Sequence, residues 1–124
     1  MLNILVVDDS LIIRKTLTAQ LEKMGHKVIA QAKSGAEAIE LYSTHKPDLV
    51  TMDISMPEMD GIVALQKIKT EYDAAKIIMV TSRGEEKLVM ESLSIGARGY
   101  ILKPITIEKL DATISKVYPE YKND

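Results

Sequence analysis

The sequence has no cysteine, tryptophan or phenylalanine, and its five aromatic residues are all tyrosine. Without cysteine the chain has neither disulfides nor thiolate chemistry, and a cytoplasmic setting is expected. No apolar run approaches the length that spans a bilayer, so membrane insertion is not expected. The net charge is −2, and the charged residues are scattered rather than gathered into a basic stripe, so no nucleic-acid partner is expected.

What the sequence does contain is the composition of one globular domain, which we assign to residues 1–124. Of its residues 46% are hydrophobic and 27% are charged. Five short apolar runs rich in β-branched residues are typical of strands covered on both faces. They span residues 4–7, 28–32, 49–52, 77–80 and 100–102. Helical segments separate them, with predicted N-terminal caps at Ser34 (with Glu37), Asp60, Ser82 (with Glu85) and Thr106.

This alternation of strand and helix predicts an α/β fold, a five-stranded parallel sheet with five helices on its two faces. Short connections that each contain a helix require parallel strands and right-handed crossovers. In such folds ligands bind beyond the C-terminal ends of the strands. At those ends the sequence places Asp8 and Asp9, then Asp53, Thr81 with Ser82, and Lys103. We therefore expect these three carboxylates, two hydroxyls and one ammonium to form one site.

The chemistry of this predicted site favours phosphoryl transfer. Three nearby carboxylates repel one another by several kcal/mol (on the order of 3 kcal/mol per close pair at an effective dielectric near 20), so a cation should accompany them. Oxygen donors favour Mg²⁺, and Lys103 supplies a second positive charge. An aspartate in such a site can act as a nucleophile toward phosphorus. No histidine or cysteine stands at the strand ends to serve a triad-type hydrolase, and neither GxGxxG nor GxxxxGK[ST] occurs.

The motifs VVDDS, MDISMPEMDG, MVTS and LKP, in this order and spacing, resemble the CheY-like receiver domain of two-component response regulators. The resemblance covers residues 4–117 and implies the strand order 2-1-3-4-5 of the flavodoxin/CheY-like fold. It implies that Asp53 accepts the phosphoryl group. It also implies that Asp9 binds Mg²⁺ directly, that Asp8 acts mainly through a metal-bound water, and that Asp53 and the backbone carbonyl of Ser55 complete the protein ligands.

The same resemblance assigns the remaining site residues. Lys103 would contact the phosphoryl group, and its peptide bond to Pro104 would be cis. Thr81 would be the switch hydroxyl and Tyr100 the coupled switch aromatic, which turns from an exposed to an inward rotamer. Two residues would modulate the lifetime of the phosphoryl group in opposite directions, namely Ser55 and Arg83.

We interpret the chain as a stand-alone, monomeric receiver that acts as a switch and not as a turnover enzyme. A histidine kinase or histidine phosphotransfer protein would donate to Asp53, and the apolar segment Leu11–Ile13 is a candidate docking patch for that donor. The surface of the fourth helix, fifth strand and fifth helix would then bind a target protein. The ending YPEYKND adds no linker or DNA-binding domain, so output is expected to pass through another protein.

Three functional alternatives follow from the same residues. The stretch VTMDISMPEMDG resembles the corresponding stretch of chemotaxis-type receivers, which favours a chemotaxis role. A phosphorelay intermediate, which passes the phosphoryl group to a histidine phosphotransfer protein, is the second alternative. The third is a Mg²⁺-dependent phosphohydrolase with an aspartyl-phosphate intermediate. That class usually has a second aspartate two residues after the nucleophile, where this chain has Ser55, and an inserted cap domain that this chain has no length to supply.

Overall fold

Strands and helices alternate through the computed structural model, which describes residues 1–121. The strands are β1 (Asn3–Val7), β2 (Lys27–Ala32), β3 (Leu49–Met52), β4 (Ile77–Thr81) and β5 (Gly99–Leu102). The helices are α1 (Leu11–Lys23), α2 (Gly35–His45), α3 (Gly61–Glu71), α4 (Glu86–Ile95) and α5 (Ile107–Val117), followed by the 3-10 turn η1 (Pro119–Tyr121). Across these described residues, no helix combines the length and apolar character needed to cross a membrane.

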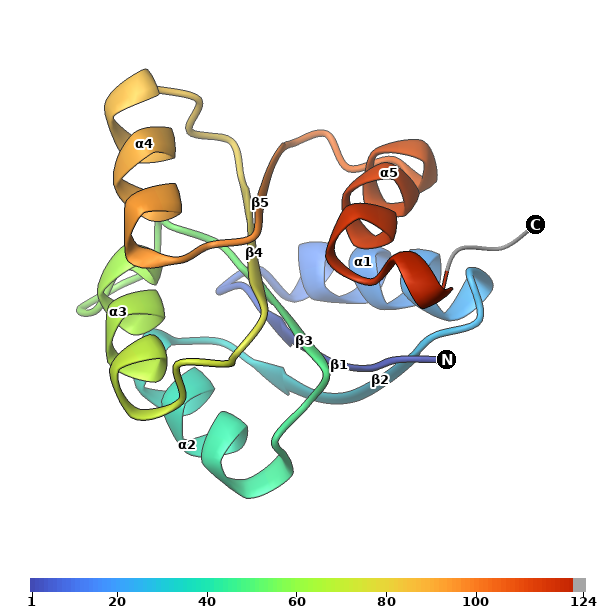
Figure 1. Ribbon diagram of the computed structural model, residues 1–124, viewed down its shortest axis with the longest axis horizontal. Helices are drawn as coiled ribbons and strands as arrows, with labels where there is room; N and C mark the ends of the chain where they lie inside the picture. The colour runs from blue at the N-terminus through green and yellow to red at the C-terminus, as the bar shows by residue number, and fades with distance from the viewer. Residues whose placement is uncertain (122–124) are drawn as a thin grey trace.

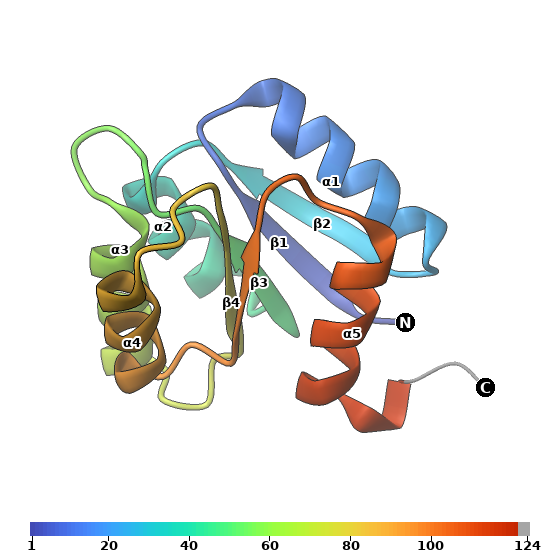
Figure 2. The same ribbon diagram turned by 90° about the horizontal axis from the view of Figure 1, so that it is seen from above.

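All five strands pair in parallel in the order β2-β1-β3-β4-β5, which confirms the predicted fold class and strand order. Helices α2, α3 and α4 cover one face of the sheet, and α1 and α5 cover the other (Figures 1 and 2). The central strands β3 and β4 are buried throughout, whereas the edge strand β2 is partly exposed. The uninterrupted apolar runs therefore correspond to strands that are covered on both faces.

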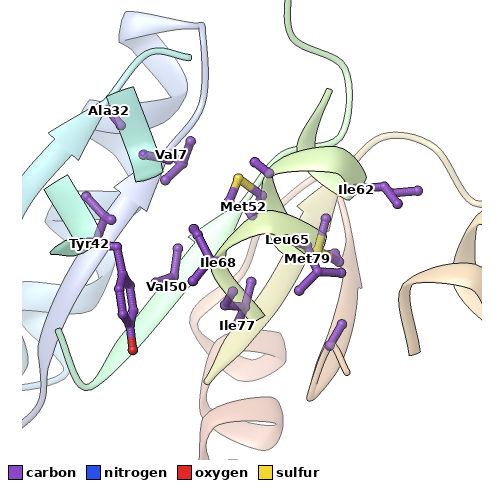
Figure 3. Packing of buried hydrophobic residues seen from close by; sticks show 14 of the residues in the cluster. Val7, Ala32, Tyr42, Val50, Met52, Ile62, Leu65, Ile68, Ile77 and Met79 are labelled. Carbon is purple, nitrogen blue, oxygen red and sulfur yellow. The ribbon is translucent and has the colours of Figure 1, made fainter. Parts of the chain in front are cut away.

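Two hydrophobic clusters fill the space on either side of the sheet. Because successive strand residues point to opposite faces, β1 sends Leu5 and Val7 to one cluster and Ile4 and Val6 to the other. The first cluster packs against α2, α3 and α4 (Figure 3) and the second against α1 and α5. Each fully buried Leu, Ile or Val contributes about 1.5–3 kcal/mol to folding, so these two clusters hold the strand ends in register.

Three of the predicted helix caps are present. The hydroxyl of Ser34 accepts a hydrogen bond from the backbone N–H of Glu37 at 3.1 Å, and Thr106 caps α5 in the same way at 3.1 Å. Asp60 accepts the first free N–H groups of α3, both at 2.9 Å. The Glu37 carboxylate reaches the N–H of Lys33 at 3.0 Å rather than that of Ser34, so the reciprocal bond of the capping box is shifted by one residue.

The predicted capping box of Ser82 with Glu85 is wrong. Helix α4 begins at Glu86, and its cap residue Glu85 makes no side-chain capping bond. The hydroxyl of Thr81 instead accepts the N–H of Arg83 at 3.3 Å, which holds residues 82–85 as a loop before the helix starts. The helix also leaves the apolar side chain of Leu93 44% exposed. A competing local hydrogen bond and a later helix start therefore replace the predicted cap.

Candidate functional site

The loops that follow β1, β3, β4 and β5 lie along one edge of the molecule, the upper side in Figure 2. There Asp8, Asp9 and Asp53 each place a carboxylate oxygen within 4.8 Å of the others. Asp8 and Asp53 are almost fully buried, at 2% and 5% exposure, whereas Asp9 is exposed. The predicted convergence of the three acids is confirmed, and the two adjacent aspartates have different environments.

Backbone pairing places the two buried carboxylates side by side. Val7 pairs with Met52 at the ends of β1 and β3, so the next residues of both strands emerge together. The N–H of Asp53 donates to the carbonyl of Val7, and the N–H of Asp8 donates to that of Ala32, both at 3.0 Å. These bonds extend the sheet ladder by one residue. The chain then turns away, and Asp9 points toward solvent at the rim of the site.

Lys103 joins the two buried carboxylates. Its Nζ lies 2.8 Å from Asp8 Oδ2 and 3.3 Å from Asp53 Oδ2. Burial lowers the pKa of the Lys103 ammonium, but the hydrogen bond to Asp8 and the charge of Asp53 outweigh that effect. The pKa therefore lies above its usual value, and the side chain is charged at neutral pH.

The loop after Asp53 is shaped by backbone contacts. Asp53 Oδ1 accepts the N–H of Ile54 at 2.7 Å, and the N–H of Gly61 donates to the carbonyl of Ile54 at 2.8 Å. A Cβ atom on Gly61 would lie 1.9 Å from the carbonyl oxygen of Asp53. Glycine is therefore required where α3 begins, because any side chain there would displace the backbone of Asp53. Ser55 lies exposed on the same loop.

The two predicted switch residues hold one loop residue from opposite sides. Thr81 is fully buried, and its hydroxyl accepts the N–H of Arg83 at 3.3 Å. The Oη of the half-buried Tyr100 donates to the carbonyl of Arg83 at 2.5 Å. Burial, together with the charge of Glu85, raises the pKa of Tyr100, so its hydroxyl is protonated and able to donate at neutral pH. The guanidinium of Arg83 pairs at the surface with Glu85 at 3.4 Å.

The peptide bond between Lys103 and Pro104 is cis, as the resemblance implied.

The structure also shows two contacts near the site that the sequence does not predict. Arg14 of α1 donates from Nη1 to the backbone carbonyl of Asp8 at 2.8 Å and from Nε to the side chain of Gln31 at 3.2 Å. Lys109 donates to carbonyls on both sides of Lys103. Neither contact carries a sequence signal, because both depend on how helices pack against loops.

The donor set fits a hard divalent cation. The three acids offer only oxygen, the donor that Mg²⁺ prefers, and one of them is open to solvent, where bound waters can remain. Lys103 compensates one of the three negative charges, so two remain uncompensated within the cluster. A divalent cation would balance that charge.

Fold and site together define a class of protein. Residues 4–115 match the response regulator receiver domain, and the chain belongs to that family. It is 44% identical over 113 residues to the chemotaxis protein CheY of Bacillus subtilis (strain 168), covering 91% of this chain and 94% of that protein. It is 40% identical over 114 residues to the chemotaxis protein CheY of Thermotoga maritima, covering 92% of this chain and 95% of that protein.

A solved structure shares the fold closely. The crystal structure of the CheX–CheY–BeF3–Mg²⁺ complex from Borrelia burgdorferi superimposes with a TM-score of 0.91 at 38% identity, covering 94% of this chain and 88% of that chain. These matches confirm the family that the sequence motifs indicated.

Proposed function

We propose that this chain is a single-domain response regulator whose Asp53 accepts a phosphoryl group from a phosphohistidine, with a role in chemotaxis signalling. The donor would be a histidine kinase or a histidine phosphotransfer protein. The observation that carries the proposal is the cluster of Asp8, Asp9 and Asp53 with the ammonium of Lys103 in hydrogen-bonding contact with two of its members. The chain would be a cytoplasmic monomer.

The resemblance assigns the role of nucleophile to Asp53, and its burial beside Lys103 supports that assignment. Asp8 has both oxygens engaged, Oδ1 with the N–H of Ser10 at 2.9 Å and Oδ2 with Lys103 at 2.8 Å. Asp53 also has both oxygens engaged, Oδ1 with the N–H of Ile54 at 2.7 Å and Oδ2 with Lys103, but its contact with Lys103 is longer than that of Asp8, at 3.3 Å, so Oδ2 of Asp53 is held less closely. An Asp53 oxygen would attack phosphorus while the phosphorus–nitrogen bond of the phosphohistidine breaks. The electron pair of that bond would return to the imidazole, leaving an acyl phosphate on Asp53.

The chain's own groups would hold and neutralise the transferred group. Asp8, Asp9, Asp53 and the backbone carbonyl of Ser55 are the candidate ligands for Mg²⁺. When bound, Mg²⁺ supplies positive charge to the oxygens of the phosphoryl group. The Lys103 ammonium, already in contact with Asp53, would bond one of those oxygens. Ser55 is small and exposed, which leaves room for attacking water, whereas Arg83 is paired with Glu85 outside the site.

Phosphorylation would change the α4-β5-α5 surface. The Thr81 hydroxyl would leave the N–H of Arg83 for the phosphoryl group, and Tyr100 would follow because its hydroxyl bonds the carbonyl of the same residue. That surface exposes Met90, Leu93 and Leu102, apolar side chains at 61%, 44% and 44% exposure, which suit a protein target. A bias of a few kcal/mol between two states (about 3 kcal/mol) is enough for such a switch.

One observation favours the chemotaxis role, and a second is compatible with both that role and the phosphorelay alternative. Similarity to proteins named chemotaxis protein CheY supports the first. The exposed Leu11 and Ile12, at 53% and 75% exposure beside Asp9, fit the docking of a helical phosphodonor and leave room for the second. In either role the chain would carry out only its own phosphorylation and dephosphorylation.

Phosphorylation with a small donor tests the proposal. Wild type and Asp53→Asn are incubated with acetyl phosphate, with and without Mg²⁺, and the intact mass is measured. We expect the mass of one phosphoryl group on wild type only, and only with Mg²⁺. Modification of Asp53→Asn, or an unmodified wild type, would contradict the proposal. Transfer from phospho-Asp53 back to a histidine phosphotransfer protein would decide for the phosphorelay role.

A further inference from the structure

The loop that carries Lys103 is bound by two side chains from neighbouring helices. Lys109, in the first turn of α5, donates from Nζ to the carbonyl of Leu102 at 3.1 Å and to that of Pro104 at 3.0 Å. Gln20 of α1 donates from Nε2 to the carbonyl of Ile105 at 3.0 Å. Three of the four carbonyls from residue 102 to residue 105 therefore have a side-chain donor.

Lys109 donates hydrogen bonds to the two carbonyls that flank Lys103. On the opposite side, the N–H of Lys103 donates to the carbonyl of Thr81 at 2.9 Å. The backbone of Lys103 is thus held from β4 on one side and from α5 on the other. The ammonium of a lysine is tied to its backbone by a stem of limited length, so the position of that backbone sets the region that the ammonium can reach. Here that ammonium reaches Asp8 and Asp53 at 2.8 and 3.3 Å.

Helix α5 does not need Lys109 for its own start. Thr106 already caps the helix by accepting the N–H of Lys109 at 3.1 Å. A positive charge in the first helical turn also opposes the helix dipole, whose N-terminal end is itself positive. The Lys109 ammonium therefore lies where the helix dipole disfavours a positive charge. In that position it donates to two carbonyls of the preceding loop.

We propose that Lys109 is a positioning residue for Lys103, holding the β5–α5 loop so that the Lys103 ammonium is aimed at the phosphoryl site. This inference rests on the proposed function, since it assigns Lys109 an effect on phosphoryl transfer. Lys109 acts only through the backbone on either side of Lys103 and does not contact the reacting atoms. Its loss leaves every predicted metal ligand and the nucleophile in place.

Three variants test the assignment. Lys109→Met removes the donors but keeps a similar stem, Lys109→Arg keeps charge and donors, and Lys116→Met is the matched control. Lys116 lies on the exposed side of the same helix, and its substitution removes the same charge as Lys109→Met. Each is compared by the phosphorylation rate with acetyl phosphate at saturating Mg²⁺, and by hydrogen exchange of the Lys103 amide in metal-free protein, measured by NMR.

We expect Lys109→Met to slow phosphorylation about tenfold or more, because small displacements of a catalytic group have effects of this size. Exchange of the Lys103 amide should accelerate in the same variant. Lys109→Arg should restore both measurements, and Lys116→Met should match wild type in both. Circular dichroism confirms that each variant is folded, and Lys109→Gln replaces Lys109→Met if the latter is not.

Other outcomes overturn the inference. Equal slowing in Lys109→Met and Lys116→Met would assign the effect to net charge, and a wild-type rate in Lys109→Met would leave Lys109 no role in positioning. Wild-type exchange of the Lys103 amide in Lys109→Met would show that the loop does not depend on this side chain. A wild type that takes up no phosphoryl group would refute the proposed function instead, and the exchange measurement would still judge whether Lys109 holds Lys103.

Discussion

The β3–α3 loop and the β5–α5 loop deliver opposite charges to the same site by different means. The loop after Asp53 is fixed by its own backbone, with Gly61 packed so closely that a Cβ would lie 1.9 Å from the carbonyl of Asp53. The loop with Lys103 has one backbone bond, from the N–H of Lys103 to the carbonyl of Thr81, and is otherwise fixed by side chains from two helices, Gln20 of α1 and Lys109 of α5. A backbone contact of the first kind tolerates no change, whereas hydrogen bonds of the second kind can be lost one at a time, each at a cost of about 1 kcal/mol.

The largest expected effect comes from Gly61→Ala. The added methyl group meets backbone atoms that cannot move without moving Asp53, so we expect a loss of about 3 kcal/mol in the free energy of unfolding. Gly84→Ala is the control, because its Cβ would meet the side chain of Leu102 at 3.1 Å, and that side chain can shift. Urea unfolding of both variants measures the difference. Similar losses in the two would show that the β3–α3 loop is no more constrained than the β4–α4 loop.

The next effect concerns Asp9, the carboxylate that the β1–α1 loop adds beside the opposite charges of the two compared loops. Asp9→Asn removes one of three mutually repelling carboxylates, so we expect the metal-free protein to become more stable, with a rise in Tm of about 3 °C. The same change should weaken Mg²⁺ binding by about tenfold or more, because a candidate ligand is lost. Thermal unfolding with and without Mg²⁺ measures both. Asp73→Asn, an exposed site beyond α3, is the control and should change neither. A less stable metal-free Asp9→Asn would contradict the repulsion argument.

A smaller effect is expected for Gln20→Met, which tests the side-chain support of the β5–α5 loop. The variant keeps the stem but leaves the carbonyl of Ile105 without its side-chain donor, at an expected cost of about 1 kcal/mol in the free energy of unfolding. Gln66→Met on the exposed face of α3 is the matched control. Urea unfolding measures both. A loss as large as that of Gly61→Ala would remove the distinction between the two loops.

The smallest effect is at the opposite edge of the sheet, away from both loops. Burial and the nearby amino group of Met1 lower the pKa of His26 against an opposing effect of Asp111, and its Nδ1 accepts the N–H of Leu2 at 3.1 Å. The unfolded chain therefore binds a proton more readily than the folded protein. Stability should be complete above about pH 6.5, the unfolded pKa, and fall as the pH drops through the folded pKa.

The cost of acidification at His26 should be smaller than the cost of Gln20→Met, because the ring is only partly buried. His26→Gln should remove this component of the pH dependence of Tm, and His45→Gln, at an exposed position, should retain it. Identical pH profiles in the two variants would refute the assignment to His26.

Local sequence patterns predicted which residues form the site, but they did not predict the contacts that hold those residues in place. Asp8, Asp53 and Lys103 were predicted to converge because the C-terminal ends of parallel strands share an edge, whatever the details of packing. The caps at Asp60 and Thr106 follow from hydrogen bonds within a few residues. The cap predicted at Ser82 is absent because α4 begins at Glu86, after a loop in which the hydroxyl of Thr81 accepts the N–H of Arg83, a competing local bond.

What the sequence alone determined is which residue types stand at which strand ends, and hence an acidic, oxygen-only site with one lysine in a receiver fold. The tertiary structure decided which of two adjacent aspartates is buried, where Lys103 points, and which side chains hold its loop. Periodicity and capping act over a few residues, whereas the bond from Lys103 to Asp8 joins residues 95 positions apart and the bond from Gln20 to Ile105 joins residues 85 apart. Such contacts exist only once both helical layers have packed onto the sheet.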